Sequence, residues 1–126
     1  MDSKEEIKAW REVKKKGKWA DAFRGLHVFW KTTRSLRTHV VAAVLVIFFG
    51  FYFKVSSFEW IALIFAIGLV LVTEALNTAI EIDIDLTSPD YHPFARDTKD
   101  VAAAAVLLSV FTAVVIGLIV FLPKIF

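Results

Sequence analysis

The sequence predicts an all-α membrane protein with three transmembrane helices and an amphipathic interfacial helix ahead of them. Hydrophobic residues make up 57% of the 126 positions and the mean hydropathy is +0.61, which is more apolar than is usual for a soluble domain. Charged residues still make up 22%, so they must gather between apolar runs. Buried helices of a soluble bundle are the alternative, but three consecutive runs almost free of charge argue against it. The length permits a single domain over residues 1–126.

The first segment, residues 1–35, is polar and basic and is expected at the cytoplasmic face. Four apolar residues recur in it at helical spacing among charged ones: Trp19, Phe23, Leu26 and Trp30. Such a stripe suits a helix lying in the membrane interface, with basic groups toward the lipid phosphates. A solvated basic anchor explains the lysine run at Lys14–Lys16 equally well.

The three apolar runs are expected to span the membrane over residues 36–53, 58–80 and 101–122. A membrane helix needs about 20 mostly apolar residues. The third run meets this length by itself. The first two reach it when the helix continues past its cytoplasmic end.

The distribution of lysine and arginine predicts the orientation. Eleven of the fifteen lie at or before Arg37, the linker after the first span carries only Lys54, and the linker before the third carries Arg96 and Lys99. Because basic residues remain in the cytoplasm, the N-terminus is expected there and the C-terminus outside.

The inner end of the second span carries polar groups that a passive anchor does not need. At 100° per residue, Glu74 and Glu81 fall within about 20° of each other on one helix, and Asn77 and Thr78 flank them. An ionisable residue within a membrane is costly and is usually paired or functional. Glu74 is therefore a candidate general base.

Two other interpretations of Glu74 are open. It could pair with Arg34 or Arg37 from a neighbouring helix, which would be a structural role. It could also belong to an ion or proton pathway, which would depend on no nucleotide.

A second polar cluster opens the third span, where Lys99 and Asp100 could contact a phosphate and a metal. Salt pairing at a helix start explains the same residues. Together, the carboxylates, the Lys–Asp pair and the basic helix are the parts that phosphoryl transfer requires. There is no P-loop signature, and His27, His39 and His92 lack metal-ligand spacing. We expect His39 to be a helix-start or interfacial residue.

At these positions the sequence resembles the prokaryotic diacylglycerol kinase family, which includes undecaprenol kinases. Three stretches carry the resemblance: EALNTAIEIDIDL at Glu74–Leu86, SPDYH at Ser88–His92 and KDVAAAAVLL at Lys99–Leu108. The resemblance implies a homotrimer in the bacterial inner membrane, with sites between protomers that transfer the γ-phosphate of MgATP to a lipid alcohol. The residues of these stretches resemble undecaprenol kinases more than diacylglycerol kinases, which favours undecaprenol as the lipid substrate. We expect ATP, Mg²⁺ and membrane lipids as partners and no nucleic acid.

The resemblance also implies residue roles. Glu74 matches the catalytic base, Asn77 the residue supporting it, Asp100 a further catalytic group, and Glu81 a Mg²⁺ ligand. Arg37, with Glu74, matches the lipid-substrate side. Nucleotide contacts are expected from Lys14, Asp21, Glu81, Asp90, Tyr91, His92, Lys99 and Asp100.

One departure from the family pattern bears on metal binding. Before the first span the family reads Glu-x-Asn-x-Arg-x-His, whereas this chain has Thr33 where the glutamate would share the metal with Glu81. A neutral hydroxyl is a weaker Mg²⁺ ligand than a carboxylate. Asp83 stands where the family is apolar, and on a continuous helix it faces away from Glu81. The alternative function is thus a catalytically weak or inactive lipid-binding member.

Overall fold

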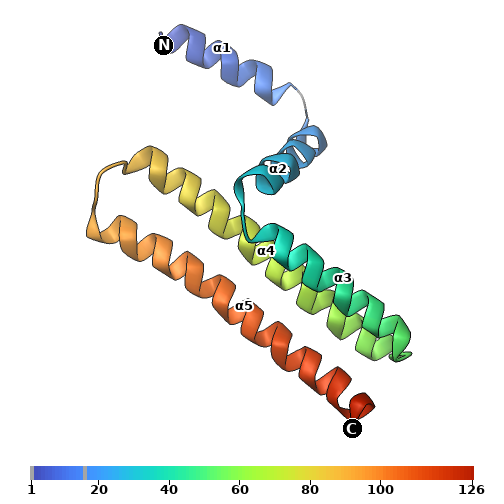
Figure 1. Cartoon of the computed structure of the whole chain (residues 1–126). Helices are drawn as coiled ribbons and strands as arrows, with labels where there is room; N and C mark the ends of the chain where they lie inside the picture. The colour runs from blue at the N-terminus through green and yellow to red at the C-terminus, as the bar shows by residue number, and fades with distance from the viewer. Residues whose placement is uncertain (1, 16) are drawn as a thin grey trace. The chain divides into compact units, whose positions relative to one another are not determined.

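The computed structural model describes residues 2–15 and 17–126, which form two compact units divided after Thr32. The described residues form five helices and no strand, which confirms the all-α class (Figure 1). The first unit holds α1 (Ser3–Lys14) and α2 (Lys18–Thr32). The second holds α3 (Leu36–Tyr52), α4 (Ser57–Thr87) and α5 (Pro93–Ile125).

In the first unit, Asp2 caps the start of α1, because its carboxylate accepts a hydrogen bond from the Lys4 amide at 3.3 Å. Gly17 precedes α2 with φ +81°, a conformation that a residue without Cβ adopts at little cost. On α2, Trp19 is 82% exposed and Phe23 is 67% exposed. The helix therefore keeps the uncovered aromatic stripe that the interfacial interpretation requires.

In the second unit, α4 is the central helix, and both α3 and α5 pack against it (Figure 1). The hydrophobic core gathers where α3 turns into α4. Its buried members are Val55, Leu63 and Val120, with Trp60 and Phe121 packed against them.

A capping box starts α4. The Ser56 hydroxyl accepts from the Glu59 amide, and the Glu59 carboxylate accepts from the Ser56 amide. The helix has 31 residues, about 46 Å, so it is longer than the roughly 30 Å hydrocarbon layer. It continues past residue 80, the predicted end of the span, because no proline or glycine interrupts it before Ser88.

The helix α5 also exceeds its predicted span. His92 caps its start by accepting the Phe94 amide on Nδ1, and Pro93 occupies the first turn, where a missing N–H costs nothing. At the other end the helix runs through Pro123 to Ile125, beyond the predicted limit of 122. Proline removes only its own amide donor there, and the Phe126 amide still bonds to the Leu122 carbonyl at 3.0 Å.

By length and composition, α4 and α5 can each cross a membrane. The first predicted span, which corresponds to α3, has 17 residues, about 26 Å, and meets the same test only when α2 is counted with it.

Candidate active site

Glu74 lies on α4, facing the start of α3, and is only 4% exposed. Two side chains meet its Oε1 atom: the Ser35 hydroxyl donates to it at 3.0 Å, and the His39 Nε2 atom lies 2.8 Å away. When Glu74 is ionised, its oxygens can only accept, and the imidazole Nε2 is then the donor. These bonds offset part of the cost of burying a charged group.

Asn77 and Glu81 continue the face of α4 that carries Glu74, because the helix is unbroken from Ser57 to Thr87. The Asn77 amide donates to Glu81 Oε1 at 3.3 Å. Its own Oδ1 is buried and has no hydrogen-bond partner within the described part of the chain. Glu81 is exposed. The helix is thus continuous through both carboxylates, and of the two Glu74 is buried and Glu81 is exposed.

Thr33 lies beside this face and is buried at 9% exposure. Its hydroxyl is 2.6 Å from that of Thr78, which is also buried. Thr78 follows Glu74 by one helical turn. The position that the family pattern gives to a metal-binding glutamate is thus occupied here by a hydroxyl already bonded to α4.

A polar hollow of about 260 Å³ lies at the turn between α4 and α5. In this hollow the Lys99 Nζ atom lies 2.5 Å from Asp85 Oδ1. The Arg96 Nε atom lies 3.7 Å from Asp100 Oδ2, one turn further along α5. The lining comprises Ile84, Asp85, Ser88, Pro89, Asp90, Tyr91, His92, Ala95, Arg96, Lys99 and Asp100. The turn therefore gathers two cations and three carboxylates in one concave surface.

The charge of Lys99 is stabilised by its surroundings. Lys99 precedes the apolar run that begins at Val101, and its hydrogen bond to Asp85 raises its pKa above the usual 10.5. The charge of Glu81 acts in the same direction. Both carboxylates therefore stabilise the protonated form of Lys99, which carries a positive charge at neutral pH.

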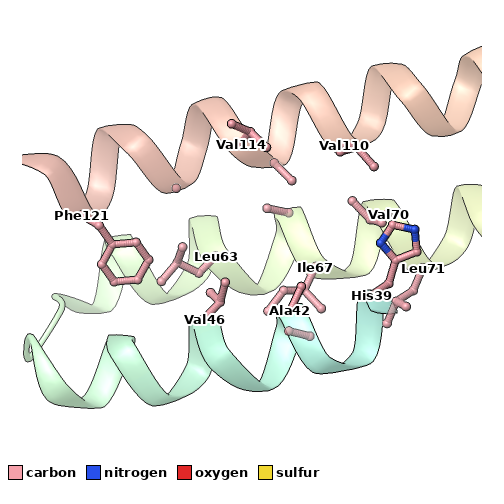
Figure 2. A pocket seen from close by; sticks show the side chains of 14 residues that line it. His39, Ala42, Val46, Leu63, Ile67, Val70, Leu71, Val110, Val114 and Phe121 are labelled. Carbon is pink, nitrogen blue, oxygen red and sulfur yellow. The ribbon is translucent and has the colours of Figure 1, made fainter. Parts of the chain in front are cut away.

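An apolar pocket of about 270 Å³ lies between α3, α4 and α5. Figure 2 shows Phe121 and Leu63 toward one end and His39, with Val70 and Leu71, at the other. His39 is the one polar side chain among its lining residues. The imidazole that bonds to Glu74 is thus also the polar end of an apolar pocket.

The comparison with known protein families decides the identity of this arrangement. The model of prokaryotic diacylglycerol kinase matches residues 20–121, most of the chain. The chain belongs to this family. The match includes both the Glu74 face and the hollow at the turn.

Individual relatives agree with the family assignment. Undecaprenol kinase of Bacillus subtilis is 40% identical over 103 residues, 82% of this chain and 84% of that protein. Diacylglycerol kinase of Escherichia coli K12 is 31% identical over 94 residues, 75% of this chain and 77% of that protein.

In this family member, the predicted site residues fall into separate places. Glu74, Asn77 and Glu81 share one face of α4, and five lie around the hollow: Asp90, Tyr91, His92, Lys99 and Asp100. Arg37 is in the first turn of α3. Lys14 and Asp21 belong to the first unit, on α1 and α2.

The residues present fit a magnesium ion that arrives with a nucleotide. Within residues 2–15 and 17–126, no group of three His, Cys, Asp or Glu side chains could hold a metal by itself. Mg²⁺ bound to phosphates needs only one or two protein carboxylates, and the exposed Glu81 would supply one. At the position of the second ligand, Thr33 offers only a neutral, buried hydroxyl, which is hydrogen-bonded to Thr78.

The sequence did not predict the two partners of Glu74. His39 was expected at a helix start, where it lies, but not in contact with the carboxylate. The available signal was the spacing of Ser35 and His39, which places both on one face of α3 one turn apart.

Proposed function

We propose that this protein is a membrane kinase that transfers the γ-phosphoryl group of ATP to the hydroxyl of a lipid alcohol, with undecaprenol as the preferred substrate. Its family and the names of its relatives support lipid phosphorylation. The observation that carries the mechanism is Glu74, a carboxylate buried within the spans on the same helix face as the exposed Glu81.

In the proposed reaction, Glu74 accepts the proton of the lipid hydroxyl while the lipid oxygen attacks the γ-phosphorus. A bond forms between that oxygen and phosphorus, and the bond from phosphorus to the β–γ bridging oxygen breaks. ADP leaves with the bridging oxygen, and Glu74 then releases its proton to water. Positioned proton transfer of this kind contributes about 10²- to 10⁴-fold in rate.

We assign the nucleotide phosphates to the hollow at the α4–α5 turn. Lys99 supplies positive charge there, while Asp100, paired with Arg96, holds a second cation in place. Asp90, Tyr91 and His92 form the rim, and Lys14 and Asp21 are further contacts. Bound Mg²⁺ would neutralise phosphate charge, with Glu81 as its protein ligand and Asn77 fixing the Glu81 carboxylate.

The preference for undecaprenol rests on the apolar pocket that ends at His39. A lipid whose hydroxyl reaches Glu74 would lay its nearest hydrocarbon along this pocket, and a 150 Å³ apolar cavity already holds benzene. The lining offers no donor for ester carbonyls apart from His39. A single polyprenyl chain suits it better than diacylglycerol. Arg37, near the start of α3, is assigned to the lipid headgroup side.

We further propose a homotrimer in the bacterial inner membrane, with the N-terminus in the cytoplasm. The excess of basic residues before the first span supports the orientation. A thin core supports assembly, since no large side chain of the described residues is less than 2% exposed. The trimeric number rests on the family resemblance.

The test is transfer of labelled phosphate from ATP to undecaprenol and to diacylglycerol in micelles, with Glu74→Gln beside Glu59→Gln. Glu74→Gln should lose at least about 10²-fold in kcat while ATP binding remains. Glu59→Gln is a matched control at the other end of α4, because glutamine still completes the capping box. Equal activity of both variants would exclude Glu74 as the base.

The competing function is a silent lipid-binding member, which the bonded hydroxyl of Thr33 favours. It predicts no transfer to either lipid by the wild type, together with retained binding of undecaprenol. The named activities of the relatives favour the kinase.

A further inference from the structure

Ser35 is the cap residue of α3, yet its hydroxyl makes no capping bond to the helix. A serine at this position ordinarily accepts a hydrogen bond from an amide in the first turn. Here the hydroxyl donates instead to Glu74 Oε1 at 3.0 Å. Helix capping therefore does not explain this side chain, whereas its contact with α4 does.

His39 lies one turn further along α3 and reaches the same oxygen at 2.8 Å. Both bonds end on Oε1, so they fix the rotation of the carboxylate and direct Oε2 as the atom that receives a proton. The imidazole is about one-fifth exposed and also lines the apolar pocket (Figure 2). One ring thus touches both the proposed base and the space assigned to the lipid.

We infer that His39 and Ser35 are positioning residues for phosphoryl transfer, which orient Glu74 toward the hydroxyl of a lipid alcohol lying in the pocket between α3, α4 and α5. The inference rests on the proposed function. The two residues take no part in bond making; they act through Glu74. A carboxylate held by two donors from one rigid helix keeps the short distance to the hydroxyl that proton transfer needs.

Two substitutions separate hydrogen bonding from packing at position 39. His39→Phe keeps a ring of similar size but removes the donor. His39→Gln removes the ring but keeps a nitrogen donor three bonds from Cβ, as in histidine. Ser35→Ala and Ser35→Thr form the equivalent pair at the cap.

The experiment measures kcat and KM for both substrates with each purified variant in micelles, after circular dichroism and gel filtration have established that it is folded. His39→Phe should lower kcat on the order of 10- to 100-fold and leave the KM values for ATP and undecaprenol within about twofold. His39→Gln should regain most of the loss. Ser35→Ala should lower kcat by a smaller factor, and Ser35→Thr should restore it.

The other outcomes each overturn the inference. If His39→Phe equals the wild type and His39→Gln is the weaker enzyme, the ring serves packing alone. If both lose activity equally, the imidazole acts as an acid or base in its own right and not by holding Glu74. Should the wild type itself transfer no phosphate to any lipid, the proposed function fails, and this result is distinct from an active wild type with unaffected variants.

Discussion

The buried hydroxyl pair of Thr33 and Thr78 fixes the segment before α3 to the face of α4 that carries Glu74. Each hydroxyl is the partner of the other, and both side chains are nearly inaccessible. Losing one hydroxyl leaves the other buried and unsatisfied, whereas losing both leaves an apolar contact of similar shape. The pair therefore holds the ends of two helices in register next to Glu74.

A double-mutant cycle tests this pair. Thr33→Val and Thr78→Val should each destabilise the folded protein by about 0.5–2 kcal/mol, and the double variant by less than their sum. The measurement is reversible unfolding in mixed micelles, followed by circular dichroism. Thr112→Val is a control on α5, where the hydroxyl bonds only within its own helix. Strict additivity of the two substitutions would contradict direct coupling.

The contact between Lys99 and Asp85 predicts a pH effect on nucleotide binding. Because Asp85 raises the pKa of Lys99, the charge is complete below the usual value of 10.5 and is lost only as pH rises through the higher, folded-state value. The KM for ATP should stay flat into the alkaline range. In Asp85→Asn the KM for ATP should begin to rise at a lower pH than in the wild type, because Lys99 has lost the carboxylate that stabilises its charge. If the KM for ATP rises over the same alkaline pH range in the wild type and in Asp85→Asn, this role for Asp85 is refuted.

Glu74 could be singled out from the sequence, but its partners could not. A carboxylate at the end of an apolar run is conspicuous because burying its charge is costly. Ser35 and His39 are 39 and 35 residues away, and their contact depends on the register of α3 against α4. That register is set by packing between helices, which no local pattern encodes.

At the scale of whole elements, Gly50 on α3 packs tightly against Trp60 on α4. A Cβ atom there would lie 2.5 Å from the Trp60 ring, which is tilted against the Phe51 ring at a centroid distance of 4.9 Å. Small residues permit such close packing between membrane helices. The glycine therefore lets the tryptophan fill the junction beside the hydrophobic core.

Gly50→Ala should destabilise the fold by about 1–3 kcal/mol, because the ring must move out of a packed position. Gly68→Ala is the matched control on α4, where a Cβ meets nothing within 4 Å and alanine should be neutral or stabilise by up to about 1 kcal/mol. Unfolding in micelles measures both. Equal effects of the two substitutions would show that the Trp60 contact does not limit packing.

Helix positions followed from the sequence more closely than helix ends. The apolar runs predicted α3, α4 and α5 because only helices satisfy their backbone in lipid. The end of α4 was missed by seven residues, since the stretch to Thr87 alternates acidic and apolar side chains without a breaker. This extension matters for function, because it carries Glu81 and Asp85 on a rigid helix and not on a loop.

At the scale of the whole molecule, the proposed kinase activity depends on the direction in which the chain crosses the membrane. Glu74, the proposed base, and the polar hollow lie toward the end of α4 that joins α5, whereas the α3–α4 turn at Lys54 lies at the other end. ATP is cytoplasmic, so the proposed kinase works only when the α4–α5 turn faces the cytoplasm. The chain has no cysteine, which makes single-cysteine labelling free of background.

Lys54→Cys and Leu86→Cys should therefore react from opposite sides. Leu86 follows the start of α4 by about 44 Å, more than the roughly 30 Å hydrocarbon layer, and its side chain is 78% exposed. A membrane-impermeant maleimide added to spheroplasts should label position 54 and spare position 86, and inverted vesicles should give the reverse pattern. Both variants should retain kinase activity, since neither residue lines the hollow or the apolar pocket. Labelling of position 86 from the outside would place the proposed phosphate site on the side of the membrane without ATP, and the proposed direction of phosphoryl transfer would then be wrong.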